Sequence, residues 1–523
     1  MGTHRTSPSS AAELLPGRDE SYWMASSPST ALPPLTEDTE ADVVVVGGGI
    51  AGLSTAWELA RTGLHVVVLE ADRIAAGVTG HTTAKASALH GLVYERILRT
   101  RGEQATRLYA RSQQGAVERI AAVAAELGVD CAWERRPAFT YTTDPGNRDA
   151  LKAEASAAHG AGLDVHYTVE TALPFEVAAA VCAEGQAQFH PRAYLLALAT
   201  DLAARGSVIH ERSRVTRLHE GSPCRVTTEA GYTVTARDVV VATHYPVFDR
   251  ALLFARLSPR RELVVAAPLP EGADPGGMYL TEDGSKRSVR TAPYPEGDGG
   301  RLLIVTGESF TPGDGDATAG FARLDAWMRT HFPVGETAYR WAAQDNDVSD
   351  TVPMIGRYHP GAKHTYVATG FGGWGMSGGV LAGQLLTRLL HGEEPPWTGL
   401  YDPRRLWSTV REAPSLLRQQ ADVARHFVGD RMATTHVDSV AEIAPGTGAV
   451  VRIGGSRCAV YRDKDGTAQA VSARCTHLGC LVAFNQAETA WECPCHGSRF
   501  APDGSVLQGP ATRPLPQRDV SGE

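Results

Sequence analysis

The feature that most constrains this chain is a cluster of cysteines and histidines near its C-terminus. Four of the eight cysteines lie in two short segments, Cys475–Cys480 (CTHLGC) and Cys493–Ser498 (CPCHGS). The first segment contains a Cys-x-His pair and the second a Cys-x-x-His pair. Two thiolates and two neutral imidazoles suit a [2Fe–2S] cluster with two cysteines on one iron and two histidines on the other. A zinc ribbon is the alternative, but zinc ribbons favour Cys-x-x-Cys knuckles, which neither segment contains.

Both segments resemble, letter for letter, the Rieske iron–sulfur proteins whose two cluster loops are joined by a disulfide, as in the Rieske subunits of respiratory and photosynthetic cytochrome complexes. The resemblance implies a [2Fe–2S] cofactor with four ligands: Cys475, His477, Cys493 and His496. It also implies a disulfide between Cys480 and Cys495. The other cysteines are scattered, and we expect them to be buried apolar residues: Cys131, Cys182, Cys224 and Cys458.

A second constraint lies near the N-terminus, where a β-branched strand pattern ends in glycines. The pattern Asp42–Val46 is followed by Gly-Gly-Gly-Ile-Ala-Gly at 47–52, a helix pattern over 50–62 and a second strand pattern over 65–69. Glycines at 47, 49 and 52 between a strand and a helix form the dinucleotide-binding fingerprint. Glu70, at the end of the second strand, is placed to bind ribose hydroxyls.

Each glycine of this fingerprint has its own task. Gly47 allows the tight turn, Gly49 lets the pyrophosphate approach the backbone, and Gly52 allows the helix to pack closely on the strand. The alternative interpretation is an ordinary glycine-rich strand-to-helix turn without a nucleotide.

Five further segments resemble the superfamily of D-amino-acid oxidase, glycine oxidase and sarcosine oxidase. They cover positions 75–85, 206–215, 238–244, 350–356 and 366–379. The resemblance spans roughly residues 40–400 and implies FAD as the cofactor. Besides Gly47, Gly49, Gly52 and Glu70, it implies these cofactor-binding residues: Gly77, Thr79, His81, Thr83, Val215, Gly370, Gly372, Gly373, Trp374 and Met376.

Four residues are candidates for catalysis, each with a structural alternative. His81 has the spacing of a histidine that binds flavin covalently in relatives that oxidise dimethylglycine, or it only hydrogen-bonds the cofactor. Lys85 and His90 are candidate proton acceptors, or they form ordinary structural contacts. Arg290 could bind a substrate carboxylate, although a chance placement is the simpler interpretation for one of many arginines.

We therefore expect an α/β, Rossmann-like FAD domain with an α+β substrate-binding domain, followed by a small all-β Rieske domain. The expected boundaries are an N-terminal arm (1–39), an oxidoreductase domain (40–400), a linker (401–434) and a Rieske domain (435–523). Within the oxidoreductase domain, FAD-binding parts (about 40–91, 200–249 and 346–392) alternate with substrate-binding parts (about 92–199 and 250–345). The arm is rich in Ser, Pro and Thr and is expected to be loose, with an apolar island at 21–24 that could dock on the body.

The two cofactors predict a function. A dehydrogenase would pass electrons from an amine, amino acid or hydroxy acid to FAD, then to the cluster, and on to an external acceptor such as a small redox protein, a quinone or O₂. The alternatives are an oxygen-using oxidase with a structural or redox-sensing cluster, and a non-catalytic electron-transfer protein. A net charge of −9 gives no nucleic-acid footprint. Neither an export signal nor an apolar span is visible, so we expect a cytoplasmic protein without a membrane anchor.

Overall fold

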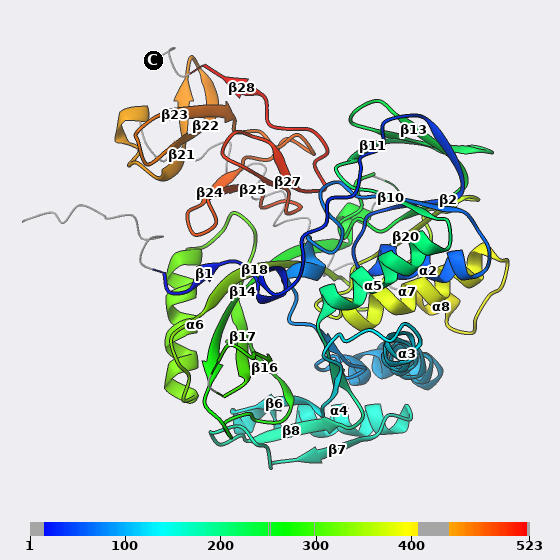
Figure 1. Ribbon diagram of the computed structural model, residues 1–523. Coiled ribbons are helices and arrows are strands. Elements are labelled where there is room, and N and C mark those ends of the chain that lie inside the picture. Colours follow the sequence, from blue (N-terminus) through cyan, green and yellow to red (C-terminus); the bar gives the residue numbers. More distant parts are fainter. Residues whose placement is uncertain (1–14, 249, 251–252, 298, 406–438, 520–523) are drawn as a thin grey trace, which may run out of the picture.

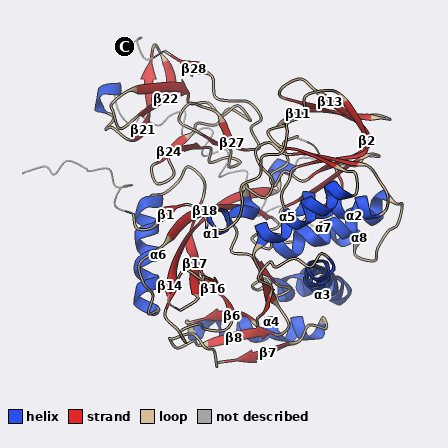
Figure 2. Ribbon diagram, viewed as in Figure 1, coloured by secondary structure: helices blue, strands red, loops and turns tan. Residues whose placement is uncertain are grey.

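The computed structural model describes residues 15–248, 250, 253–297, 299–405 and 439–519. Two sheets with their helices form the body, and an all-β domain sits at one end of it (Figures 1 and 2). Most of the expected linker, residues 406–434, lies outside the described residues. Among the described helices, none is both long enough and apolar enough to cross a membrane.

The first sheet is built around the fingerprint strand. Its strand order is β10-β3-β2-β13-β12-β11, and β20 pairs with β13 and with β19. The pairs joining β10, β3, β2, β13 and β20 are parallel, which is the pattern expected of a nucleotide-binding α/β sheet. The strands are β2 (Thr39–Val46), β3 (Val66–Leu69), β10 (Val208–His210), β11 (Val215–His219), β12 (Cys224–Thr228), β13 (Thr233–Val241), β19 (Met354–Arg357) and β20 (Thr365–Thr369).

Helices cover one face of this sheet, at the right of Figure 1. Valines 43 and 45 of β2 pack with residues of α2 and α7, while Val44 and Val46 face a second apolar cluster. The sheet is therefore buried on both faces, as its continuous apolar strands predict. The helices of this half are α2 (Ile50–Arg61), α3 (Val93–Glu126), α5 (Pro191–Ala204), α7 (Gly375–Leu390) and α8 (Thr398–Tyr401). The axis of α3 breaks at Gly102, whose φ is 81°.

The second sheet has the order β1-β18-β14-β17-β16-β15-β6-β8-β7 and is mixed. Helix α6 (Ala317–His331) packs on β14 and β17, and α4 (Arg148–Gly160) packs on β7 and β8. The strands are β1 (Arg18–Asp19), β6 (Ala138–Thr142), β7 (Val165–Thr168), β8 (Ala179–Ala183), β14 (Leu257–Leu269), β15 (Met278–Thr281), β16 (Arg287–Pro293), β17 (Arg301–Phe310) and β18 (Tyr339–Val348). A small third sheet consists of β4 (Lys85–Ala86), β9 (Ala187–Gln188) and β5 (Glu134–Arg135), in that order.

The described part of the N-terminal arm is packed on the body, so the expectation of a loose arm does not hold for it. Strand β1 pairs in parallel with β18, and the short helix α1 (Tyr22–Ala25) buries Tyr22 and Trp23. The Trp23 indole donates to the carbonyl of Thr82 at 2.6 Å. The apolar island therefore docks against the segment that follows the fingerprint, as the sequence allowed.

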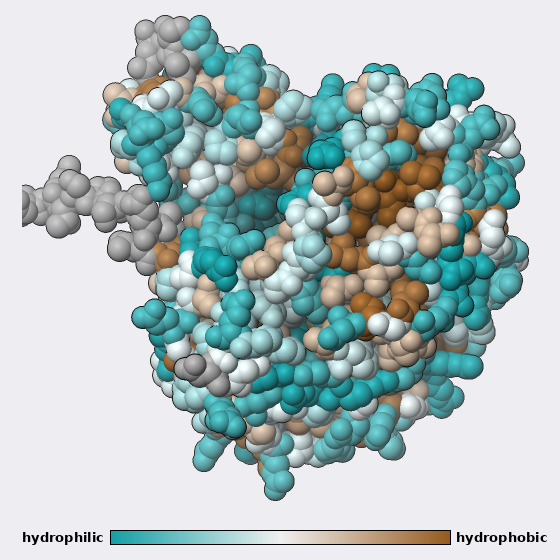
Figure 3. Space-filling view, in the orientation of Figure 1, coloured by the Kyte–Doolittle hydropathy of each residue, from teal (hydrophilic) through white to brown (hydrophobic). Residues whose placement is uncertain are grey.

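The C-terminal domain consists of two four-stranded sheets. One is antiparallel throughout: β21 (Thr447–Ile453), β22 (Ser456–Arg462), β23 (Ala468–Ser472) and β28 (Gln517–Arg518). The other is also antiparallel: β24 (Ala483–Asn485), β25 (Ala490–Glu492), β26 (Arg499–Phe500) and β27 (Val506–Gln508). The expected all-β fold is confirmed. In the space-filling view a notch with apolar walls separates this domain, at the upper left, from the first sheet's half at the upper right (Figure 3).

Candidate functional site

A cavity of about 410 Å³ extends from the fingerprint to the C-terminal domain. Its walls come from all three parts of the described chain. The first sheet and its loops contribute Gly47, Gly49, Glu70, Thr243 and His244, among others. The second sheet contributes Arg261, Trp341, Gln344 and Asp345, and the C-terminal domain contributes Glu488, Arg499, Gln508 and Thr512.

The glycine-rich turn fits the close packing that a dinucleotide site requires. Gly47 has φ of +109°, and a Cβ atom added there would lie 2.4 Å from the carbonyl oxygen of Ala242. A Cβ atom on Gly52 would lie 1.8 Å from the carbonyl oxygen of Gly47. Neither position accepts a side chain. The turn therefore brings the backbone and the N-terminus of α2 to the cavity wall, where phosphate groups are favoured.

Two side chains complete this end of the cavity. Glu70 accepts hydrogen bonds from the backbone N–H of Gly48 at 2.7 Å and of Asp72 at 2.9 Å. Burial raises the pKa of Glu70, and these two N–H donors oppose that rise. Thr79 accepts a hydrogen bond from the N–H of Ile50 at 3.1 Å, so its hydroxyl caps the start of α2.

The structure brings most of the predicted cofactor residues to one cavity. Those that line it are Gly47, Gly49, Glu70, Gly77, Thr79, His81, Val215, Gly373 and Met376. Five others are not among its lining residues: Gly52, Thr83, Gly370, Gly372 and Trp374. The Trp374 ring stacks on His90 with 4.4 Å between centroids, so it packs beside the cavity.

His81 lies at the end of the 3₁₀ turn Val78–His81 and lines the cavity. Its Nδ1 is 2.9 Å from the carbonyl oxygen of Gly77. A carbonyl can only accept, so Nδ1 carries the proton and Nε2 keeps its lone pair. Burial lowers the pKa of His81, so the ring is neutral at pH 7. Covalent attachment requires such an available nitrogen, and the same lone pair can accept a hydrogen bond from a hydroxyl of the cofactor.

Lys85 lies beyond the cavity wall, on β4, where its ammonium donates to the Ser288 hydroxyl. Burial lowers the pKa of Lys85 to about 7, with Glu262 opposing the shift. At neutral pH a substantial fraction of this amine is therefore unprotonated and able to accept a proton.

His90 and Arg290 are held in structural networks away from the cavity wall. His90 Nδ1 lies 2.7 Å from the Tyr109 hydroxyl, Nε2 lies 2.6 Å from the Ser87 carbonyl oxygen, and burial lowers the pKa of His90 to about 3. The guanidinium of Arg290 donates to backbone carbonyls, including that of Ala84 at 2.8 Å. Burial lowers the pKa of Arg290 to about 9. A substrate carboxylate in the cavity would not meet this side chain.

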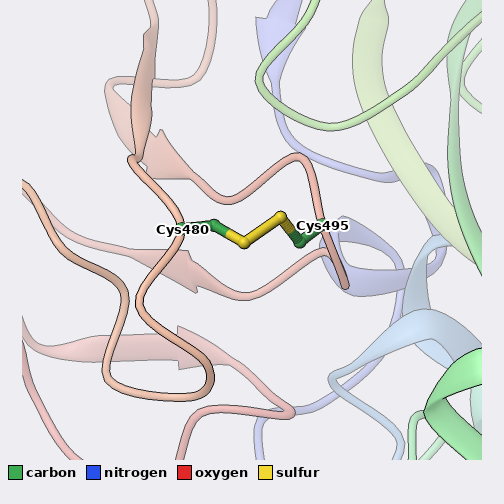
Figure 4. Close-up of a disulfide and its surroundings, with 2 residues drawn as sticks. All are labelled: Cys480 and Cys495. Carbon is green, nitrogen blue, oxygen red and sulfur yellow. A yellow bond between two sulfur atoms is a disulfide. The ribbon is translucent and has the colours of Figure 1, made fainter. Parts of the chain in front are cut away.

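Two loops of the C-terminal domain carry the predicted cluster ligands, and they have matching geometry. In the first loop the N–H of Gly479 donates to the carbonyl of Cys475, and in the second the N–H of Gly497 donates to that of Cys493, both at 2.9 Å. Both glycines have positive φ. The sulfur atoms of Cys480 and Cys495 form a disulfide that joins the loops (Figure 4), as expected.

The donor set of the two loops fits a [2Fe–2S] cluster. Cys475 and Cys493 are buried, and hydrogen bonding between their thiols lowers the pKa of Cys475 to about 7. The rings of His477 and His496 lie 4.9 Å apart at 89°. Two converging thiols and two converging imidazoles are the ligands that the sequence assigned to the two irons.

The boundary between the C-terminal domain and the second sheet is a buried charge network that sequence reasoning missed. Arg261 of β14 contacts Glu488 at 2.5 Å and Glu492 at 3.3 Å, and Arg499 contacts the same two carboxylates at 2.9 and 3.1 Å. Arg261, Glu488 and Arg499 also line the cavity. None of these residues belongs to a recognisable motif.

A second group of missed residues surrounds Asp345 of β18. Its carboxylate accepts from the N–H of Gly373 at 2.6 Å and lies 3.7 Å from His244. Although burial alone would raise the pKa of Asp345, His244 and Arg260 hold it below its usual value. His244 ends the segment 238–244, which resembled the superfamily, so a signal for its position was present in the sequence.

Comparisons with known proteins agree with this arrangement. Residues 42–389 match the family described as FAD dependent oxidoreductase, and residues 433–519 match the Rieske [2Fe-2S] domain. A Bacillus subtilis (strain 168) protein described as the Rieske 2Fe-2S iron-sulfur protein YhfW is 34% identical over 503 residues, which is 96% of this chain and 98% of that protein.

Solved structures show the same fold at lower identity. Glycine oxidase from Geobacillus kaustophilus has a TM-score of 0.56 at 21% identity and covers 68% of this chain and 96% of its own. L-proline dehydrogenase from P. horikoshii has a TM-score of 0.58 at 19% identity and covers 72% of this chain and 99% of its own. At these identities the likeness concerns the fold.

Proposed function

The chain belongs to the FAD-dependent oxidoreductase family and carries a C-terminal Rieske [2Fe–2S] domain, and from this premise we propose that it is a dehydrogenase whose electrons leave through the cluster. The proposed substrate is an amine, an amino acid or a hydroxy acid, and the acceptor is an external one-electron carrier such as a small redox protein or a quinone. Bound FAD supplies the chemistry that removes two electrons from the substrate as a hydride.

One observation carries the proposal: residues of the Rieske domain form part of the wall of the FAD cavity. Glu488 and Arg499 line the same cavity as Gly47 and Gly49. A cluster domain that served only as a structural or sensing module would have no need to share this wall. Its position favours direct passage of electrons between the two cofactors.

The chain's own residues can serve the substrate reaction in simple ways. The N-terminus of α2 and the turn at Gly47–Gly49 bind the negatively charged part of the cofactor. The neutral ring of His81 and the His244–Asp345 pair supply polar contacts within the cavity.

The deciding experiment is an anaerobic titration of the holoprotein with a panel of amines, amino acids and hydroxy acids. We expect a productive substrate to bleach the flavin absorbance and then to produce the electron paramagnetic resonance signal of the reduced cluster. Flavin bleaching with no later cluster signal would overturn the proposal.

A measurement in air distinguishes the proposed dehydrogenase from the alternative, an oxygen-using oxidase. A dehydrogenase should produce little hydrogen peroxide per substrate consumed, and Cys475→Ala should abolish reduction of an added one-electron acceptor. One peroxide per turnover, unaffected by Cys475→Ala, would instead identify an oxidase whose cluster is not in the electron path.

A further inference from the structure

The segment after β13 faces the FAD cavity on one side and the cluster loops on the other. Ala242, Thr243, His244 and Val247 line the cavity. Tyr245, in the middle of this segment, is 2% exposed and turns its ring to the Rieske domain. One short stretch of backbone thus connects the two sites.

The ring of Tyr245 contacts both predicted histidine ligands. Its centroid lies 6.0 Å from that of His496 and 6.5 Å from that of His477, both edge to face. Such perpendicular contacts are favourable for aromatic rings. The histidine side of the cluster site therefore faces the FAD-binding half, and Tyr245 fills the space between them.

The position of Tyr245 is fixed from several directions. The hydroxyl of Thr243 donates to the Tyr245 carbonyl at 2.8 Å, and the hydroxyl of Thr369 donates to the carbonyl of His244 at 2.5 Å. The Tyr245 hydroxyl donates to the carbonyl of Phe254 at 3.4 Å. A ring held in this way can keep the distance between the cavity and the histidine ligands constant.

A neighbouring contact points to the same face of the cluster. Gln344 lines the cavity and donates from Nε2 to the carbonyl of Gly497 at 3.0 Å, one residue after His496. The second cluster loop thus contacts Gln344, a cavity residue of the second sheet, as well as Tyr245, which follows β13 of the first sheet.

We propose that Tyr245 is a positioning residue for electron transfer: it holds the histidine-ligated iron against the FAD cavity, so that electrons enter the cluster from its histidine side. This inference rests on the proposed function. Each transfer moves one electron from reduced FAD to the oxidised cluster. Two transfers, with the cluster reoxidised between them by a one-electron carrier, return FAD to its oxidised state and release one proton to solvent.

The test uses the full-length holoprotein under anaerobic conditions, with EDTA as the sacrificial donor and a light pulse that reduces the bound FAD. Cluster reduction is followed by its visible absorbance and its electron paramagnetic resonance signal. We expect Tyr245→Leu to slow cluster reduction about tenfold, and Tyr245→Phe, which keeps the ring, to stay within about twofold of the unaltered protein.

Phe254→Leu is the matched control. The Phe254 ring also lies 6.0 Å from that of His496, but Phe254 lies outside the cavity-lining segment 242–247 that contains Tyr245. We expect the rate of cluster reduction in Phe254→Leu to stay within about twofold of that of the unaltered protein, because Tyr245 still lies between the cavity and the histidine ligands. Equal slowing in Phe254→Leu and Tyr245→Leu would overturn the proposal, since shielding of the histidines would then explain both.

Two further readouts keep the outcome clear. Iron and FAD contents show whether each variant is assembled, and a redox titration gives the cluster potential. Loss of the ring admits water, which stabilises the more negative reduced cluster and raises its potential, so a weaker driving force cannot explain slower reduction. An unchanged rate of cluster reduction in Tyr245→Leu would overturn the role of Tyr245 and leave the proposed function intact. If the cluster is not reduced even in the unaltered protein, both the role of Tyr245 and the proposed function are overturned.

Discussion

Arg261 and Glu488 form an ion pair across the boundary between the oxidoreductase body and the Rieske domain. The guanidinium Nη2 lies 2.5 Å from both carboxylate oxygens, and the Arg261 side chain is only 1% exposed. Glu492 and Arg499 extend the pair into a network of two positive and two negative groups. Since buried charges are tolerated only with partners, this network fixes how the two domains fit together.

The first prediction follows from this pair. Among the described residues, Glu488→Ala leaves Arg261 only the longer contact to Glu492. We expect the docked Rieske domain to lose about 3 kcal/mol of stability. Thermal unfolding followed by the cluster absorbance should show the loss as a lower transition temperature. The control is Glu95→Ala, which removes an exposed contact with Arg99 at 3.2 Å and should cost less than about 0.5 kcal/mol. Similar transitions in both variants would contradict a stabilising role for the boundary network.

The second prediction concerns the helix glycines. Gly52→Ala would place a methyl group 1.8 Å from the Gly47 carbonyl oxygen, so we expect the variant to lose bound FAD. Gly115 of α3 has no atom within 4 Å of an added Cβ, and Gly115→Ala should keep its FAD and gain up to about 1 kcal/mol of stability. FAD released from the purified, denatured proteins gives the occupancy. Full FAD occupancy in Gly52→Ala would contradict this prediction, because it would show that the turn can move to accommodate the methyl group.

The third prediction concerns acid stability. Asp350 is 1% exposed in its side chain and binds Arg405 at 2.6 Å and Arg101 at 2.5 Å. Burial alone would raise the pKa of Asp350, but these guanidiniums lower it to about 2. Because the pKa of Asp350 is lower in the folded protein than the value of about 3.9 in the unfolded chain, the carboxylate stabilises the folded state by about 2.6 kcal/mol at neutral pH. This gain is lost as the pH falls toward 2.

Asp350→Asn tests this directly. The variant cannot ionise, so its deficit in transition temperature relative to the unaltered protein should be constant from pH 7 to about pH 5 and should shrink below about pH 4. A deficit that stays the same at pH 3 would mean that the loss comes from altered packing.

The fourth prediction is a thiol count. The chain has eight cysteines, of which Cys480 and Cys495 form a disulfide. After acid removal of the cluster, in denaturant without reductant, we expect six thiols per chain to react, and eight after reduction. Eight reactive thiols before reduction would show that the loops are not cross-linked in the isolated protein.

The fifth prediction separates ligand cysteines from buried ones. Cys475 and Cys458 are both buried within the Rieske domain, but only Cys475 lies in a cluster loop. Cys475→Ala should abolish the iron content and the visible spectrum of the cluster, whereas Cys458→Ala should retain both. Iron retained in Cys475→Ala would rule out the assigned ligand set.

The parts of this protein that depend on short spacings could be predicted from the sequence. The turn at Gly47–Gly52 works through atoms a few residues apart, and each cluster loop closes on itself through one glycine. The break of α3 at Gly102, by contrast, depends on the positive φ of one glycine, which leaves no pattern in the surrounding side chains.

The parts that depend on distant contacts could not be predicted. Arg261 and Glu488 are separated by 227 residues, and nothing near either one distinguishes it from other surface charges. The apolar island at 21–24 was visible in the sequence as a segment able to dock. Its partners, Tyr339 of the second sheet and the turn at Val78–His81, were not. Tertiary packing decides such positions, and it leaves no periodic signal.

The cavity shared by the two domains also has a consequence for how the protein is made. Its walls include Val46 and Thr512, so they come together only once the Rieske domain has been synthesised and has docked. The earlier part of the chain can form its glycine turn and first sheet as it leaves the ribosome, because domains fold in order from the N-terminus. Docking of the Rieske domain therefore adds the remaining part of the cavity wall after the glycine turn has formed.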